Sequence, residues 1–361
     1  MGGRVFTWGF DLCVFRSDKY AAVSVDARQG MDMKIGVISF GPCQTPTLWF
    51  CVQRHREIQN FRPEEFFTVT VTVNVAGRDL AFCYAGSVRV TSRQEMSRTE
   101  AAAKQACTQQ GAVITSLTEE RKIVKRTVGL NTVTLLKVCS KGLGMFPTAT
   151  MSAAEHLYTS GYIPYPRTTA YPPTFGLDST LEEQAIHPRW ESVVGYLLSS
   201  RRIDRPEGGK DVGDHPPITP MRAAPRDEFN KWNGWKIYDY VTRHFIASLH
   251  DDCEYLERKM VVDLNGFNFL FTLHKMLDSC FLFAMPWKMK EMALNEANLP
   301  GRQLREGLLF HIRGFNTVTE YTKPLDSLQE SDLIALKDKH GIGTDASIPQ
   351  VTTCVQKSCQ A

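Results

Sequence analysis

The sequence predicts an α+β fold of several domains, in which a β domain is split in two by an inserted, mainly helical domain. Apolar and polar residues alternate with period two at 67–75 and again around 258–273, which is typical of half-buried antiparallel strands. Residues 130–249, which lie between these stretches, instead show helical spacing and helix caps. Because the strand pattern stops and then resumes, the economical interpretation is one β domain with a helical domain inserted at its tip.

The composition is that of an ordinary globular protein. The 361 residues are 43% hydrophobic and 22% charged, and the formal net charge is only +3. So small a positive excess does not indicate nucleic-acid binding by the whole surface, and any such site must be local. We find neither a stretch apolar enough to span a bilayer nor a signal peptide, and therefore expect no membrane association.

The ten cysteines are scattered along the chain, and none form a Cys-x-x-Cys pair. Zinc sites require closely spaced thiolates, so a metal site is only weakly indicated. Free, mostly buried thiols in a reducing compartment fit this pattern better, which favours a soluble intracellular protein.

The first part of the chain predicts a helix followed by strands, while residues 1–38 show only short strand-like runs without clear turns. The helix is expected to have Thr45 as its cap and Pro46 at its first position, offering free amide groups to a phosphate. The elements expected after it are strands Phe67–Val75 and Leu80–Tyr84, a helix over Ala101–Gln110 capped by the Ser97-x-x-Glu100 pair, and strand Ala112–Leu117. The basic run Arg121–Arg126 that follows is either a solvated face or a phosphate contact.

The helical part contains two elements with clear end signals. The first runs from Asn131 or Thr132 to Ser140 and ends near Gly142 or Gly144. The second is expected over Ala153–Ser160, with Ser152 and Glu155 as a capping box and Gly161 in the left-handed position that ends it. Further helical segments are expected at Glu182–Ala185, Trp190–Ser200 and Trp232–Leu249.

The last part returns to strands and closes with helices. Arg258–Leu264 and Phe267–Leu273 flank an Asn-Gly pair, which indicates a tight hairpin. A helix over Ser327–His340 is expected to be capped by Ser327 or Ser331 and ended by Gly341 and Gly343. Thr344 or Asp345 then caps a helix at about 347–356.

The extended segment after Gly161 carries the residues with the clearest chemical potential. Ile163 and Tyr165 each precede a proline and are therefore kept out of the helical region. In extended backbone, Tyr165 and Arg167 project to the same side. A phenol beside a permanent cation is a plausible phosphoryl nucleophile, since the cation stabilises negative charge on the phenolate and the phosphate. On spacing alone, a half-buried tyrosine in a Pro-rich turn remains the alternative.

Four separated motifs resemble those of type IA DNA topoisomerases, in the order of that family. They are Ser39–Leu48, Gly161–Thr168, Asp214–Met221 and His340–Pro349, and their sequences most resemble those of the eukaryotic topoisomerase III beta branch. The resemblance implies a type IA topoisomerase core with a split β arch domain and an inserted, mainly helical domain that carries the catalytic tyrosine.

The resemblance implies a reaction and a role for each matching residue. Tyr165 would attack a DNA phosphodiester to form a 5′-phosphotyrosine link, another strand would pass, and the freed 3′-hydroxyl would reseal the break. Arg167 would be the positioning cation. His215 would lie near the scissile region as a contact to the phosphate or on the Tyr165 side, with Asp214 orienting it, and a structural loop histidine is the alternative. The residues expected to contact nucleic acid are Gln44, Thr45, Thr168, Thr219, Gly341, Gly343, Thr344, Asp345 and Ser347.

The predicted domains follow from the pattern and the resemblance together. Residues 1–60 and 323–361 would form a DNA-groove domain, helical in its first part and truncated in its second. Residues 61–127 and 251–322 would be the two halves of the β arch, and 128–250 the helical domain with the catalytic tyrosine.

Family members need Mg²⁺, held by a Toprim domain N-terminal to everything in this chain, and members of this branch commonly carry a C-terminal zinc region. The nearest acidic cluster is Asp251-Asp252-x-Glu254, which reads as an exposed acidic patch, so we expect no metal to be bound by this chain. Three explanations would account for a core without the Toprim domain and the zinc region: a truncated gene model, a split enzyme or a degenerate copy. The intact motifs favour the first.

The leading hypothesis is a nuclear isomerase that breaks and rejoins single strands of DNA, and the resemblance extends this to RNA. The alternative is a catalytically incomplete single-strand-binding fragment or scaffold, which the presence of both Tyr165 and Arg167 disfavours. A Mg²⁺-dependent phosphodiesterase is excluded by the missing carboxylate cluster. A recruiting protein is not identified by the sequence.

Overall fold

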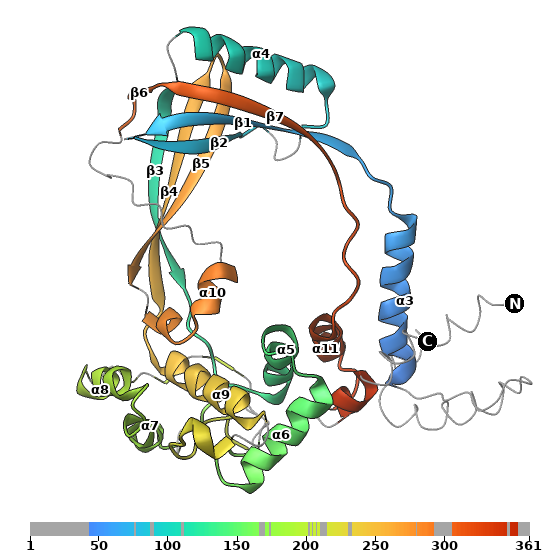
Figure 1. Ribbon diagram of the computed structural model, residues 1–361, viewed down its shortest axis with the longest axis vertical. Coiled ribbons are helices and arrows are strands. Elements are labelled where there is room, and N and C mark those ends of the chain that lie inside the picture. The colour runs from blue at the N-terminus through green and yellow to red at the C-terminus, as the bar shows by residue number, and fades with distance from the viewer. Residues whose placement is uncertain are drawn as a thin grey trace, which may run out of the picture. The chain divides into compact units, whose positions relative to one another are not determined.

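A computed structural model (Figure 1) describes residues 43–75, 77–86, 90–109, 112–165, 170–172, 175–200, 203, 205–206, 208–209, 215–229, 233–278, 280–291, 305–344 and 347–352. The chain forms two compact units. Unit 1 contains residues 1–61, 127–250 and 325–361, and unit 2 contains residues 62–126 and 251–324. The predicted α+β fold with a split β domain and an inserted helical segment is confirmed. The roles assigned to the five predicted segments stay a prediction.

Within its described residues, unit 2 is built on a single antiparallel sheet with the strand order β6-β3-β4-β5-β2-β1-β7 (Figure 1). The strands are β1 (Glu65–Val75), β2 (Arg78–Tyr84), β3 (Ala112–Val124), β4 (Cys253–Leu264), β5 (Phe267–Asp278), β6 (Leu309–Phe310) and β7 (Ile312–Tyr321). The predicted Asn-Gly hairpin joins β4 to β5, and Asn265 and Gly266 both have positive φ, at 54° and 88°. Two positive φ values are what a type I′ turn requires.

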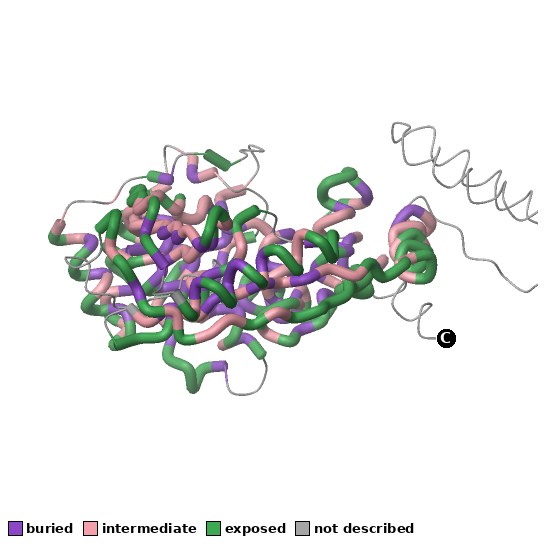
Figure 2. Tube along the Cα trace, turned by 90° about the horizontal axis from the view of Figure 1, so that it is seen from above, coloured by how far each residue is buried: buried purple, intermediate pink, exposed green. Residues whose placement is uncertain are grey.

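One face of this sheet carries the core of unit 2. Along β1, Val69, Val71 and Val73 are buried and alternate with partly exposed threonines, and the trace in Figure 2 shows such changes in burial from residue to residue. Helix α4 (Arg93–Gln109) packs against β1 and β7 and adds Ala103 and Ala106 to the same core. The period-two pattern of the sequence therefore has its cause in this one buried face. The short helices η2 (Cys280–Phe283) and α10 (Pro286–Glu291) complete the described part of the unit.

Unit 1 is helical in its described residues. Its helices are α3 (Gln44–Asn60), α5 (Thr132–Gly142), α6 (Pro147–Thr159), α7 (Leu177–Ala185), α8 (Glu191–Ser200), η1 (Arg226–Phe229), α9 (Gly234–Leu249) and α11 (Glu330–Lys339), followed by a helical turn at 347–352. Val133 and Leu136 on α5 share a buried cluster with Ile334 on α11 and Ile348 on the last turn. This cluster joins segments that are almost two hundred residues apart in sequence.

Two predicted helix ends are confirmed by their hydrogen bonds. The Asn131 side chain accepts from the Thr134 N–H at 2.8 Å and so caps α5. Gly161 ends α6 with φ 74°, its N–H donates to the Tyr158 carbonyl, and the Tyr162 N–H donates to the Leu157 carbonyl. These two bonds form a Schellman motif, which needs a residue that adopts the left-handed conformation without strain.

Several predicted helix starts are wrong, because each helix begins at an earlier signal. Helix α6 begins at Pro147, whose fixed φ and missing N–H suit the first position, so the predicted capping residue Ser152 lies inside the helix. Helix α4 begins at Arg93, with the Glu95 N–H pointing to the Ser92 hydroxyl, and Ser97 is likewise internal.

The two helices that flank the predicted groove also have caps that differ from the predicted ones. Helix α3 begins at Gln44, so Thr45 lies in its first turn instead of capping it. Helix α11 is capped by Gln329 and Asp332, which form a reciprocal capping box in place of the predicted Ser327 or Ser331.

Strand β3 is longer than predicted and includes the first half of the basic run. It pairs with β4 from Val113 to Val124, and its charged residues face acids: Lys122 lies 2.5 Å from Glu120, and Arg121 lies 3.9 Å from Glu254. Among the described helices, none is long and apolar enough to cross a membrane.

Candidate active site around Tyr165

Tyr165 lies just beyond the end of α6, on a segment that is anchored by buried residues. After the Schellman turn at Gly161, Tyr162 and Ile163 are buried, whereas the Tyr165 side chain is 40% exposed. The chain therefore leaves a rigid helix end, crosses a buried anchor and presents a phenol at the surface. That is the arrangement a nucleophile needs if it is to be both positioned and accessible.

The anchor is held by the segment that follows the Asp-His-Pro-Pro motif. The Tyr162 ring packs against Phe229 with 4.9 Å between centroids, and the Arg222 guanidinium lies 4.0 Å above the Tyr162 ring. The Tyr162 hydroxyl donates to Glu228, and the Met221 N–H donates to the Tyr162 carbonyl at 2.8 Å. Ring, cation and backbone contacts together fix the position from which Tyr165 departs.

Tyr165 contacts two other rings. Its ring centroid is 5.4 Å from that of Tyr158 and 5.2 Å from that of His215, with interplanar angles of 69° and 61°. Both are edge-to-face contacts, the arrangement that aromatic quadrupoles favour. The structure thus brings together Tyr165 and His215, which the sequence motifs place fifty positions apart.

Of the other residues in these two motifs, Arg167, Thr168 and Asp214 lie outside the described residues. Thr219 is fully buried, and its hydroxyl lies 4.0 Å from the Met221 sulfur. A fully buried hydroxyl does not reach a nucleic acid, so Thr219 does not fit the contact expected of it. Its neighbour Ile218 donates its N–H to the Leu130 carbonyl at 2.8 Å, which makes this segment a support for His215.

The glycine-rich turn after α11 lies beside the start of α3. Gly341 forms a second Schellman motif, because its N–H donates to Asp338 and that of Ile342 donates to Lys337. Gly343 has φ 85°, and a Cβ placed there would lie 2.7 Å from the Ser347 hydroxyl and 3.7 Å from the sulfur of Cys43, the residue that precedes α3. Only glycine fits this position.

Several of the predicted contact residues are therefore neighbours. Gln44 and Thr45 occupy the first turn of α3, where backbone N–H groups lack intrahelical partners. Thr344 donates its N–H to the Ser347 hydroxyl at 2.8 Å and accepts from the Ile348 N–H at 2.9 Å, so it starts the last helical turn. Asp345 lies outside the described residues. Two helix N-termini thus lie at one turn, which suits an anionic ligand.

Lys337 is a feature of this region that sequence reasoning missed. It lies on the buried face of α11, is completely inaccessible to solvent, and donates to the Ile348 carbonyl at 3.4 Å. Burial lowers the pKa of Lys337 from 10.5 to about 8, and nearby Cys43 opposes this shift. The only sequence signal for its burial is its spacing from Leu333 and Ile334, which places Lys337 on the apolar face of the helix.

The acidic cluster considered as a metal site is part of unit 2 and has a structural role. Asp252 accepts from Lys125 Nζ at 2.8 Å and from the Arg126 N–H at 3.0 Å. Partial burial raises the pKa of Asp252, but these two hydrogen bonds outweigh it and hold the pKa below its usual range. Among the described residues, no three His, Cys, Asp or Glu side chains lie together as a metal site. The donor set that Mg²⁺ requires is not met there.

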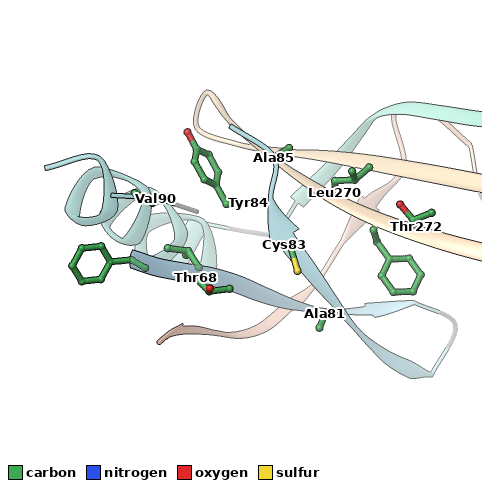
Figure 3. Close-up of a pocket in the computed structure, with 11 residues that line it drawn as sticks. Thr68, Ala81, Cys83, Tyr84, Ala85, Val90, Leu270 and Thr272 are labelled. Carbon is green, nitrogen blue, oxygen red and sulfur yellow. The ribbon is translucent and has the colours of Figure 1, made fainter. Parts of the chain in front are cut away.

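Unit 2 also has a pocket of about 470 Å³ on the face of strands β1, β2 and β5 (Figure 3). It is lined mainly by apolar and aromatic side chains, including Phe67, Tyr84, Leu270 and Phe271. None of the predicted site residues lies in it, so it is separate from the candidate site.

Comparisons with known proteins show the family of the chain. The family model described as DNA topoisomerase matches residues 7–358. The chain is 39% identical to human DNA topoisomerase 3-beta-1 over 366 residues, covering 93% of this chain and 41% of that protein. It is 38% identical to DNA topoisomerase 3-beta of Arabidopsis thaliana over 353 residues, covering 91% and 39%.

A solved structure shows the same fold. Full-length topoisomerase I from Thermotoga maritima superposes with a TM-score of 0.69 at 20% identity, covering 92% of this chain and 53% of that one. The chain spans about two fifths of the length of the curated relatives it matches. Because the family model matches nearly the whole chain, this protein belongs to the DNA topoisomerase family, in its type IA class, and it is similar to 3-beta members of that family.

Proposed function

We propose that this chain carries the nucleophile and part of the strand-binding groove of a type IA topoisomerase that acts on single-stranded DNA. The observation that carries the proposal is the exposed Tyr165 ring in contact with Tyr158 and His215, on a segment anchored at both Gly161 and Tyr162. A rigid support that ends in an accessible phenol is what a covalent mechanism requires.

In the proposed reaction, the Tyr165 oxygen attacks the phosphorus of a phosphodiester. The P–O bond to the 3′-oxygen breaks, the phenolic proton is lost to water or a nearby base, and the leaving oxygen takes up a proton to become a 3′-hydroxyl. The 5′-phosphate stays on Tyr165. Reversal of the same exchange reseals the strand, so the energy of the broken bond is kept and no nucleotide cofactor is consumed. His215 contacts the phosphate, and Arg167 supplies positive charge to its oxygens.

The turn between α11 and residue 347 is proposed to bind the sugar-phosphate backbone of the DNA strand. Free N–H groups at the start of α3 offer amide donors to phosphates, and the tight Gly341–Thr344 turn lies beside them. Gln44, Thr45 and Ser347 line the same region. Binding through the backbone is independent of base sequence and falls as salt concentration rises.

The family depends on Mg²⁺. The described residues do not provide a donor set for it, and we propose that a Toprim domain of the complete enzyme holds the ion. By analogy with the 3-beta branch, we further propose RNA as a second substrate and the nucleus as the location. The non-catalytic scaffold alternative is not favoured, because the nucleophile is present and accessible.

The test is trapping of a covalent adduct. The chain is incubated with an internally labelled single-stranded oligonucleotide, with and without a Toprim domain from a related enzyme and Mg²⁺, then denatured and resolved on a gel. We expect a labelled protein band in the complemented reaction and none from Tyr165→Phe. Tight binding without any adduct would refute the catalytic proposal, and a parallel RNA oligonucleotide tests the second substrate.

A further inference from the structure

Tyr158 is a large aromatic side chain that remains 45% exposed on the last turn of α6. Its ring lies 5.4 Å from that of Tyr165, at an angle of 69°. We propose that Tyr158 is a positioning residue that holds the Tyr165 ring in the orientation needed for attack on phosphorus. This inference rests on the proposed function, because it concerns the same nucleophile.

The backbone between the two tyrosines is held at a fixed geometry. The Tyr158 carbonyl accepts the Gly161 N–H at 3.0 Å, and the Leu157 carbonyl accepts the Tyr162 N–H at 2.9 Å. The Schellman turn therefore ties Tyr158 directly to the buried anchor from which Tyr165 departs. Rotation of the Tyr158 backbone away from Tyr165 would break the helix end itself.

The rings then restrict the remaining freedom of Tyr165. With the residues that the structure describes, the Tyr165 hydroxyl makes no hydrogen bond, so its direction is set by ring contacts. Tyr158 and His215 both make edge-to-face contacts with the Tyr165 ring. A nucleophile that must lie within about 3 Å of phosphorus in line with the leaving oxygen gains rate from such restriction, without any new contact to substrate.

Two variants separate the ring from its hydroxyl. Tyr158→Phe keeps the edge-to-face contact, whereas Tyr158→Leu removes the ring and keeps an apolar, helix-favouring side chain. Tyr196→Leu is the matched control, since Tyr196 is also exposed, lies on α8 of the same unit and stacks on His250. An aromatic pair of this kind is expected to change the rate by roughly three- to tenfold.

The measurement is the single-turnover rate of adduct formation in the complemented reaction at saturating oligonucleotide, together with the dissociation constant from fluorescence anisotropy. We expect Tyr158→Leu to lower the maximal rate roughly three- to tenfold with unchanged affinity, and Tyr158→Phe and Tyr196→Leu to match the wild type. In protein labelled with ¹³C on tyrosine rings, the Tyr165 signal is expected to shift in Tyr158→Leu only.

Each outcome decides the inference. An unchanged rate in Tyr158→Leu, with normal adduct formation by the wild type, overturns it and leaves the proposed function intact. Weaker binding at an unchanged maximal rate also overturns it, in favour of a direct contact between Tyr158 and a base. No adduct from the wild-type chain in the complemented reaction refutes the proposed function, and this inference with it.

Discussion

Replacement of Lys337 by methionine is expected to stabilise unit 1. Lys337 is fully buried in the last turn of α11, and its Nζ donates only a long bond of 3.4 Å to the Ile348 carbonyl. Methionine has a similar length and a high helix propensity, and it introduces no charge. The change therefore removes the desolvation cost of the ammonium group while filling the same space.

The magnitude follows from the pKa. A folded-state pKa of about 8 in place of 10.5 corresponds to a cost of about 3 kcal/mol for the protonated form at neutral pH. Because the variant also lacks the hydrogen bond to the Ile348 carbonyl, we expect a net gain of roughly 1–3 kcal/mol in the free energy of unfolding. The pKa is lower in the folded state, so the folded protein binds fewer protons between about pH 8 and 10.5. Wild-type stability should therefore rise with pH across that window, and the variant should not show this rise.

Urea unfolding at about pH 7 and about pH 9.5, followed by fluorescence and circular dichroism, measures both effects. Lys339→Met is the control, because Lys339 is an exposed lysine on the same helix, and it should change the free energy of unfolding by no more than about 0.5 kcal/mol. A destabilised Lys337→Met, or a gain that is the same at both pH values, would refute this account of the buried lysine.

Three further changes test local features. Asn131→Ala removes the cap of α5 and should lower the free energy of unfolding by about 1 kcal/mol, measured by urea denaturation; no loss would mean that the cap is dispensable. Gly343→Ala should lower the free energy of unfolding by about 1–3 kcal/mol, because φ is 85° and the new Cβ meets Ser347. It should also weaken oligonucleotide binding in an anisotropy titration, and unchanged binding would mean that this turn does not contact the oligonucleotide. Asp252→Asn should lower the thermal midpoint of unit 2 at neutral pH. Since the pKa of Asp252 is held below 3.8, this difference should persist above that pH and vanish as the pH falls below it; a pH-independent effect would exclude the ionic contact with Lys125.

Local signals with a unique physical cause could be predicted from the sequence. Gly161 and the Asn265-Gly266 pair occupy positive-φ positions that few residues tolerate, and the sequence predicts both turns. Asn131 lies in extended backbone and caps α5 through its side chain, and the sequence predicts the start of this helix at Asn131 or Thr132. Helix starts were less predictable. The Ser-x-x-Glu patterns at 97–100 and 152–155 lie inside α4 and α6, since Ser and Glu at that spacing also suit an exposed helix surface.

The contacts between distant segments could not be predicted from periodicity. The alternation of β3 fades where its residues become charged, and pairing with β4 is what extends the strand to Val124. The proximity of Gly343 to Cys43 depends on the packing of α11 against α3 and α5, which no local pattern encodes. Lys337 was missed for a related reason, since lysine is expected at the surface and only the fold reveals that this one is buried.

The rings around Tyr165 show both what the sequence predicts and what depends on the fold. The motif resemblance named Tyr165 and His215 separately, and the structure adds that their rings are 5.2 Å apart. Tyr158 was within the segment predicted as a helix but had no assigned role, because its contact with Tyr165 depends on how the chain turns at Gly161.

Peptide mapping of the trapped adduct tests the central claim most directly. The adduct from the complemented reaction is digested with nuclease and protease, and the peptide that carries the residual nucleotide is sequenced by mass spectrometry. The released strand is tested for extension by terminal transferase, which requires a free 3′-hydroxyl. The account predicts a 5′-phosphate on Tyr165 and an extendable released strand. Nucleotide on any other residue, or a 3′-phosphate link that leaves a strand with a free 5′ end, would contradict it.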